Sequence, residues 1–283
     1  MKLSMRAAFI SVILFFCMTG TSARSVSYNL YVKSGILSVK IGKGEYIEVM
    51  TTPAALPAAA RSGQQTGQIR LVQLNMDSGS GSTLLYELHD TIKSYQTPDG
   101  KGVFYRKATN ENKRHDIETA VFSNGSDGSA KYKVDLKSVQ TDGKVIGTSK
   151  AESSQEIFDL LSMITMLRSI DSSPSARDFM AGRELKVPMV NGLMTVDQHI
   201  RYEGRKKVKA DDGRTYNCIE VSIHDYKYGE RRETLRACVT DDSRHIPVQM
   251  DLVFSLGSIR CCLSSVVLET GLEPVQPIKA KGF

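Results

Sequence analysis

The sequence predicts a mainly β protein, built as a curved antiparallel sheet or incomplete β-barrel with one main helix packed on the concave face. Three observations lead to this prediction. Short runs rich in apolar and β-branched residues recur along the chain, separated by turns rich in Gly, Asp and Asn. The runs follow one another closely, which favours antiparallel pairing. One segment, residues 154–169, has helical spacing instead.

The first 23 residues have the layout of a secretory signal peptide. Lys2 and Arg6 form a basic start, residues 7–18 form an apolar run, and small residues follow up to Ala23. The apolar run is too short to span a bilayer. We therefore expect export to the periplasm or cell envelope with cleavage after Ala23. An uncleaved anchor and a lipid-modified Cys17 are the alternatives.

Residues 24–272 are expected to form a single β-rich domain, or two β subdomains joined near residues 151–190. A loosely ordered tail, residues 273–283, follows. After removal of the signal, the chain carries 35 basic and 31 acidic side chains, spread along its length. This mild excess gives no argument for nucleic acid as a partner. No later segment reaches the ~18 apolar residues of a membrane helix, so no transmembrane span is expected after signal cleavage.

The strands are predicted in chain order from their period and from the turns between them. Residues 248–254 show the period most clearly, because Val248, Met250 and Leu252 alternate with more polar residues. Asp-Gly pairs at 99–100, 127–128, 142–143 and 212–213 supply turns, since both residues tolerate positive φ. Residues 54–67 are expected to form a loop or flap. The predicted strands are residues 27–33, 36–41, 69–76, 102–108, 117–122, 130–139, 193–202, 216–224, 234–240, 248–254 and 258–268.

The helix is expected near residues 154–169. Ser153 can accept a hydrogen bond from the Glu156 amide, as in a helix capping box. The simpler interpretation is a helix that covers an open sheet face. The alternative is a helix that lines or closes an apolar cavity for a lipid or other apolar ligand. The ligand contacts would then be the residues at helical spacing, Leu160, Leu161, Met163, Ile164 and Leu167.

The cysteines predict a strand register. A hairpin centred at Tyr228 would place Cys218 opposite Cys238 and Glu220 opposite Arg236. An oxidising compartment would then allow a Cys218–Cys238 disulfide. The chain has no C-x₂-C pair of the kind found in zinc sites, so no metal is expected. The two neighbouring thiols, Cys261 and Cys262, are interpreted as small buried side chains.

Motifs of catalysis are absent from the sequence. There is no H-E-x-x-H, no Walker lysine loop, no G-x-S-x-G and no G-x-G-x-x-G. The histidines, at positions 89, 115, 199, 224 and 245, lie in different segments. Carboxylate pairs at 211–212 and 241–242 fall in predicted turns, where turn capping explains them. We therefore expect no enzyme activity, no catalytic residue and no cofactor.

Two stretches carry a resemblance to a known family. Residues 158–162 read Phe-Asp-Leu-Leu-Ser, and residues 239–248 read Val-Thr-Asp-Asp-Ser-Arg-His-Ile-Pro-Val and run into 255–259. With these stretches the chain resembles the exported bacterial family called "domain of unknown function 3108". The resemblance implies an envelope protein of a Gram-negative bacterium without an established activity. It also implies an architecture similar to periplasmic lipoprotein carriers, where a curved sheet wraps an apolar concavity.

Two functions remain open at this point. The first is a non-catalytic envelope protein that binds a lipid or another apolar ligand in the concavity of the sheet. The alternative is a structural or adaptor protein that binds another envelope protein through an exposed sheet edge or the flap. An unfilled cavity of several hundred Å³ would favour the first. A filled core with an exposed apolar patch would favour the second.

Overall fold

A computed structural model describes residues 22–34, 37–61, 67–79, 87–111, 114–124, 132–168, 179–227, 230–242, 245–254 and 257–269. Its strands are β1 (Ser22–Ser34), β2 (Leu37–Thr51), β3 (Ile69–Ser78), β4 (His89–Gln96), β5 (Gly102–Glu111), β6 (Arg114–Asn124), β7 (Tyr132–Gln140), β8 (Val145–Ser153), β9 (Leu185–Asn191), β10 (Met194–Lys209), β11 (Thr215–Lys227), β12 (Glu230–Thr240), β13 (Pro247–Phe254) and β14 (Gly257–Glu269). The helices are η1 (Pro53–Ala55), η2 (Ala58–Ala60) and α1 (Leu160–Arg168). Residues 1–21 of the predicted signal and the whole predicted tail lie outside the described residues.

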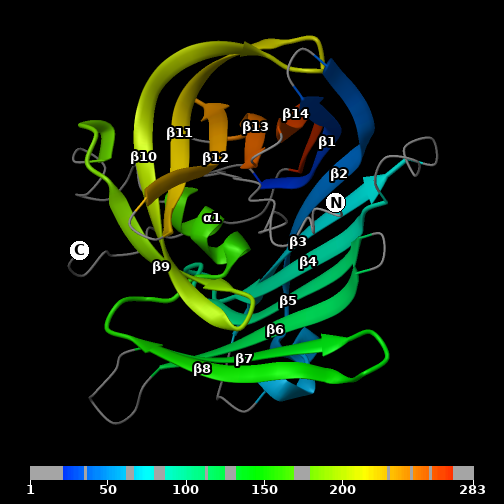
Figure 1. The fold of residues 1–283 in the computed structure, drawn as a ribbon, viewed down its shortest axis with the longest axis vertical. Helices are drawn as coiled ribbons and strands as arrows, with labels where there is room; N and C mark the ends of the chain where they lie inside the picture. Colours follow the sequence, from blue (N-terminus) through cyan, green and yellow to red (C-terminus); the bar gives the residue numbers. More distant parts are fainter. Residues whose placement is uncertain are drawn as a thin grey trace, which may run out of the picture.

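All 14 strands form one antiparallel sheet, in the order β8 to β1 followed by β14 to β9. Strand β1 joins the two halves, because it pairs with β2 on one side and with β14 on the other. Figure 1 shows the sheet curved into a nearly closed ring. The prediction of a mainly β fold with a curved antiparallel sheet is therefore confirmed.

The ring is completed without a ladder between its two edge strands. Within the described residues, β8 pairs with β7 alone. On the other edge, the Phe158 amide donates to the Pro188 carbonyl at 2.9 Å, and the Val190 amide donates to the Phe158 carbonyl at 2.8 Å. The Ser149 hydroxyl also donates to the Leu193 carbonyl. A short bridge and a side-chain contact thus close the seam, which makes the barrel incomplete.

Helix α1 begins later than predicted, because a different residue caps it. Ser153 ends β8, and its Oγ accepts from the Gln155 amide at 3.0 Å instead of capping a helix. The cap is Asp159, whose Oδ1 accepts from the amides of Leu161 (2.7 Å) and Ser162 (3.0 Å). The predicted capping box is therefore wrong. The expected end near Ser169 lies outside the described residues.

Figure 1 shows α1 inside the curve of the sheet. Its side chains share one core with strand residues from both halves, among them Tyr28 of β1 and Ile223 of β11. Burial of this kind contributes about 25 cal/mol per Å² of apolar surface, so the helix and the sheet stabilise each other. No helix in the described part of the chain combines the length and apolar character needed to cross a membrane.

Three of the four predicted Asp-Gly turns are confirmed. Gly100 and Gly143 both have φ of 90°, and Gly213 has φ of 86°, which a side chain would disfavour. The fourth pair, at 127–128, lies outside the described residues. The connection between β12 and β13 is also a tight turn, in which the Ile246 amide donates to Thr240 Oγ1 at 2.8 Å. Pro247 then begins β13, as expected for a residue without an amide donor.

The predicted cysteine register is wrong by two residues. In the β11–β12 ladder, Cys218 lies opposite Thr240 and Cys238 lies opposite Glu220. Both cysteines, like Cys261 and Cys262, are free, so the predicted Cys218–Cys238 disulfide is not formed. Two features explain the difference. Next to the turn, Lys227 pairs with Glu230, which is one residue away from a hairpin centred at Tyr228, and a bulge after Ile223 adds the second residue.

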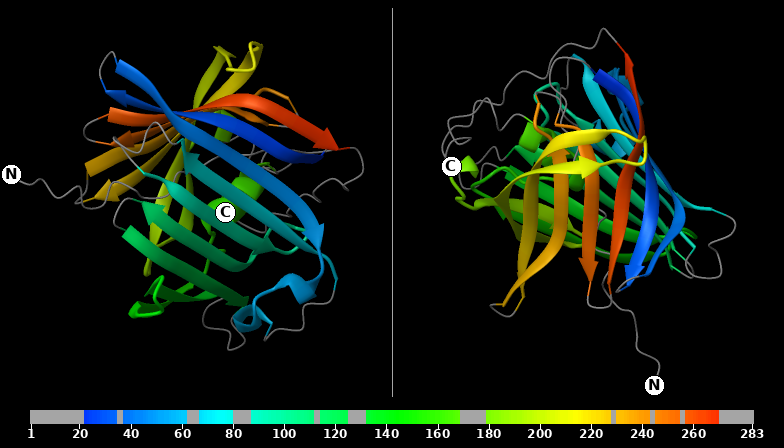
Figure 2. Two further views of the ribbon diagram at one scale, coloured as in Figure 1. Left: turned by 90° about the vertical axis from the view of Figure 1, so that its right-hand side faces the viewer. Right: turned by 90° about the horizontal axis from the view of Figure 1, so that it is seen from above.

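Residues 53–61 form a small packed layer instead of an open flap. Leu56 and Ala60 are buried against three sheet residues, and we call this group the outer cluster: Leu56, Ala60, Ile69, Val103 and Phe104. Figure 2 shows η1 and η2, in pale blue, beside the lower end of the sheet. The outer cluster thus lies apart from the core that contains α1.

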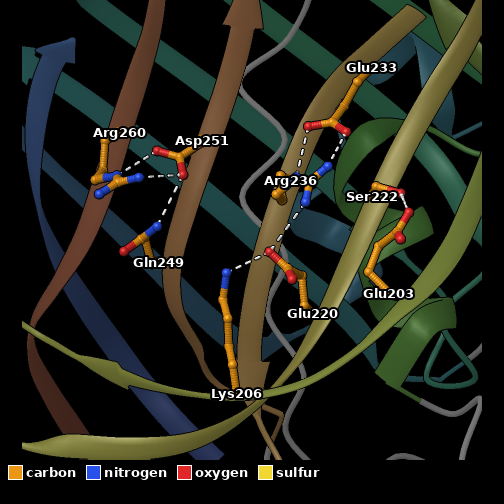
Figure 3. Close-up of polar contacts among 9 residues, drawn as sticks. All are labelled: Glu203, Lys206, Glu220, Ser222, Glu233, Arg236, Gln249, Asp251 and Arg260. Atoms are coloured by element: carbon orange, nitrogen blue, oxygen red, sulfur yellow. Dashed lines mark hydrogen bonds and ion pairs between the residues drawn. The ribbon is translucent and has the colours of Figure 1, made fainter. Parts of the chain in front are cut away.

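The β10–β11 hairpin folds over the strands that follow it. Figure 2 (right) shows this yellow hairpin crossing the orange strands toward β1. Beneath the hairpin, strands β12, β13 and β14 carry ion pairs on the side of the sheet that faces the viewer in Figure 3. Helix α1 lies behind these strands. Arg260 contacts Asp251 at 2.6 and 2.7 Å, and Arg236 contacts Glu233 at 2.9 and 2.5 Å. Figure 3 also labels Glu203, Lys206, Glu220, Ser222 and Gln249, which extend these contacts.

Candidate ligand-binding site

The five helix residues predicted to contact a ligand belong to the core. The structure brings them together on α1, and their exposed fractions range from 0% for Leu161 to 6% for Leu167. Two pockets described below are lined by other residues. The helix therefore fills space inside the sheet, and a binding site has to be sought elsewhere in the described structure. The helix residues in question are Leu160, Leu161, Met163, Ile164 and Leu167.

A pocket of about 400 Å³ opens where β5 and β7 begin and β6 ends. We call it the rim pocket, because these strand ends meet at one rim of the sheet. Its walls combine aromatic and aliphatic side chains with charged ones. The lining residues are Ala60, Thr97, Lys101, Gly102, Val103, Val121, Phe122, Ser123, Asn124, Tyr132, Lys133, Glu156 and Ile157.

Gly102 connects the rim pocket with the start of α1. A Cβ at this position would lie 3.2 Å from the Phe122 ring and 3.4 Å from Asp159 Oδ2. That oxygen also accepts a hydrogen bond from Ser94 Oγ at 2.8 Å. Glycine thus allows the helix cap to approach β5 closely, and the helix start is held directly behind the pocket wall.

Glu156 is the most perturbed acid of the rim pocket. Burial raises the pKa of its carboxyl group to about 7, although the positive charge of Lys101 acts in the opposite direction. The negative charge of Asp99 adds to the upward shift. Among the described residues, none forms a hydrogen bond with the buried Glu156 Oε1. The pocket is therefore lined by an acid whose hydrogen-bonding capacity the described residues leave partly unused.

Two lysines contribute positive charge to the same pocket. Lys101 Nζ lies 3.1 Å from Asp99 Oδ2, and the hydrogen bond to Asp99 raises the pKa of this lysine. Lys133 Nζ lies 3.3 Å from Glu152 Oε1. Both pairs are substantially exposed, so they stabilise the fold little. What matters for the pocket is where the lysines lie, because a turn holds Lys101 and strand β7 holds Lys133 at the pocket wall.

A second pocket, of about 700 Å³, adjoins the first. We call it the outer groove, since Ala59 of η2, Phe104 of β5 and residues of β6, β7 and β8 line it. Its walls are predominantly apolar, and Val121 belongs to both pockets. The rim pocket thus has charged walls, the outer groove has mainly apolar ones, and Val121 stands between them. Its lining residues are Ala59, Phe104, Thr119, Val121, Asp135, Leu136, Lys137, Val139, Thr148, Ser149 and Lys150.

The sequence interpretation missed the rim pocket for a specific reason. Glu156 was assigned to a capping box with Ser153, which gave its carboxyl group a local role. The available signal was the pair Asp99-Gly100 followed by Lys101, a turn that places a charge beside a strand start. Nothing local indicates that this turn lies beside Glu156. In the described part of the chain, no group of three His, Cys, Asp or Glu side chains could hold a metal ion.

Comparison with known proteins supports the fold and gives no activity. A family model described as "Protein of unknown function (DUF3108)" matches residues 59–263. A solved structure, described as a beta-barrel-like protein of domain of unknown function DUF1849 from Brucella abortus, is similar with a TM-score of 0.54 and 12% identity. The similarity covers 90% of this chain and 99% of that chain. At this identity the likeness concerns the fold alone. No curated protein matches the chain.

Proposed function

We propose that this chain, which belongs to the DUF3108 family of proteins of unknown function, is a non-catalytic envelope protein that binds an amphiphilic molecule. The ligand would place its polar head group in the rim pocket and its apolar chain in the outer groove. One observation carries this proposal: a charged pocket and an apolar groove meet at Val121.

The sizes of the two pockets support the proposal. Small-molecule sites usually measure roughly 300–1,000 Å³ and combine apolar walls with a few polar groups. The rim pocket and the outer groove, at about 400 and about 700 Å³, fall in this range. Burial of an apolar chain against Phe104, Val121 and Val139 would supply affinity. The charged groups at the rim would fix the orientation of the ligand.

This proposal moves the ligand out of the concavity where the sequence placed it. The concave side holds α1, whose apolar residues pack against the sheet with little exposure. A ligand at that place would have to displace the helix. The rim pocket and outer groove require no such displacement, because they are already open.

The proposal is tested by lipid uptake. We expect the purified mature chain to bind a single-chain lysophospholipid, detected by native mass spectrometry and by displacement of a fluorescent fatty acid. Val139→Glu places a charge in the groove and should weaken binding at least tenfold. Val267→Glu is the matched control, because Val267 is 55% exposed on β14 and lies outside both pockets. No uptake by the folded wild-type chain would overturn the proposal.

The envelope location is part of the same proposal and rests on the N-terminal basic and apolar pattern. We expect cell fractionation of the full-length chain to place it in the periplasm or envelope. N-terminal sequencing should then begin at Arg24. Recovery of the intact chain from the cytoplasm would contradict this part of the proposal.

A second candidate function, an adaptor for another envelope protein, is favoured by one patch. Val145, Ile146 and Met194 have exposed fractions of 53%, 51% and 60%. Val145 and Ile146 belong to the edge strand β8, and Gly147 of this strand lies against Leu193, the chain neighbour of Met194. Exposed apolar side chains beside a strand edge suit the addition of a partner strand. Site-specific crosslinking from position 146 in cells should give one discrete adduct, lost in Met194→Glu, if this function holds.

A further inference from the structure

We infer that the rim pocket selects a zwitterionic head group that carries both an ammonium with N–H donors and a phosphate, as phosphoethanolamine does. This inference rests on the proposed function, because it names the class of head group that the amphiphile presents. It goes beyond that function by assigning separate roles to the acid and to the two lysines of the pocket.

The acid supplies the first half of the recognition. Glu156 Oε1 is buried, and no described residue donates a hydrogen bond to it. The Glu156 side chain also lines the pocket, so a ligand meets its carboxylate there, and an N–H donor gains a charge-assisted hydrogen bond. A primary ammonium group has N–H donors and a positive charge, and it therefore matches this carboxylate in both respects.

The two lysines supply the second half. Lys101 follows the β4–β5 turn and Lys133 lies near the start of β7, whereas Glu156 follows β8. Positive and negative groups therefore reach the pocket from different elements. Phosphate oxygens accept hydrogen bonds from ammonium groups. A head group that bridges the acid and the lysines satisfies both kinds of charge at once.

The charge balance around the pocket disfavours simpler head groups. Asp99 pairs with Lys101 and Glu152 pairs with Lys133, and the charges that act on Glu156 are those of Lys101 and Asp99. A purely anionic head group would meet the Glu156 carboxylate without a compensating donor. A quaternary ammonium group has no N–H to donate. A head group that is neutral overall and carries N–H donors avoids both penalties.

The experiment compares three lysophospholipids that share one acyl chain and differ in head group: ethanolamine, choline and glycerol. At pH 8, where the carboxylate form prevails, we expect the wild-type chain to bind the ethanolamine form about tenfold more tightly than either other form. Glu156→Gln should reduce this preference to less than threefold. Glu230→Gln is the matched control, since Glu230 is an exposed acid on β12, away from the pocket.

The outcomes separate the inference from the function on which it rests. Equal affinities for the three lipids in the wild-type chain would overturn the head-group inference and leave amphiphile binding intact. A preference that survives Glu156→Gln would also overturn it. Binding of none of the three would overturn the proposed function itself. Thermal unfolding of each variant shows whether a lost preference reflects a lost fold.

Discussion

The hydroxyl group of Tyr31 donates a hydrogen bond of 2.7 Å to Asp211 Oδ2, across 180 residues of sequence. Asn29 Nδ2 donates to the same oxygen at 2.7 Å, and the Asp211 amide donates to the Leu263 carbonyl at 2.8 Å. These contacts hold the tip of the β10–β11 hairpin over β14 and β1. The tip thus fastens the later half of the sheet to the strand at which both halves meet.

The first prediction concerns this contact. The hydrogen bond to Asp211, followed by burial, raises the pKa of Tyr31 to about 12. Asp211→Ala should lower the pKa of Tyr31 toward the ordinary value of about 10. NMR titration of ring-labelled tyrosine would measure the change. Asp142→Ala, in the exposed β7–β8 turn, is the control, and an unchanged Tyr31 pKa in Asp211→Ala would contradict the contact.

The second prediction concerns the cysteines. Burial raises the pKa of the Cys218 thiol to about 12 and that of Cys262 to about 11. The thiolate is the reactive form, so at pH 8 the folded chain should react with a thiol reagent at least a hundredfold more slowly than the unfolded chain. Peptide mapping without reduction should find Cys218 and Cys238 unlinked. A linked peptide would show that the register of β11 and β12 is different.

The third prediction is a pH dependence of stability that depends on Glu156. Its pKa is raised from 4.5 to about 7 in the folded state, mainly by burial. Between these values the folded state binds more protons, so this group destabilises the fold as pH rises. Glu156→Gln should match the wild type at pH 4, below the unfolded-state pKa, and exceed its stability by on the order of 2 kcal/mol at pH 8.5. Urea unfolding at both pH values measures the difference, which should be absent for Glu230→Gln.

The fourth prediction compares the observed helix cap with the predicted one. Asp159→Ala removes the acceptor of two helix amides and of Ser94, and should lower the free energy of unfolding by about 2 kcal/mol or more. Ser153→Ala removes only a turn contact and should cost less than about 0.5 kcal/mol. Chemical denaturation of both variants makes the comparison. If Ser153→Ala lowered the free energy of unfolding more than Asp159→Ala, the result would support the predicted capping box instead.

The fifth prediction tests whether α1 is core or binding surface. Leu161 and Ile164 are fully buried, so Leu161→Ala and Ile164→Ala should each cost about 2–5 kcal/mol of stability. Their affinity for a lysophospholipid, measured on the folded fraction, should stay within twofold of the wild type. A tenfold loss of affinity without loss of stability would instead place the ligand at the helix.

The cysteine register shows where prediction from the sequence reached its limit. The hairpin of β11 and β12 was expected, and both cysteines do lie on these strands. The observed pairing differs from the expected one by two residues. Because side chains alternate with a period of two, such a shift leaves every residue on the same face. The apolar pattern therefore cannot reveal it, and the position of the turn and the bulge after Ile223 decide it together.

The sequence by itself determined the strand-rich class, the antiparallel arrangement and most of the tight turns. Those features depend on side-chain alternation and on residues such as Gly100 and Gly213, whose effects are local. Only the tertiary structure decided that β1 pairs with β14, that Asp159 caps α1, and that Lys101 and Glu156 share a pocket. These contacts join residues far apart in the chain, and they form only because the whole sheet curves round to meet itself.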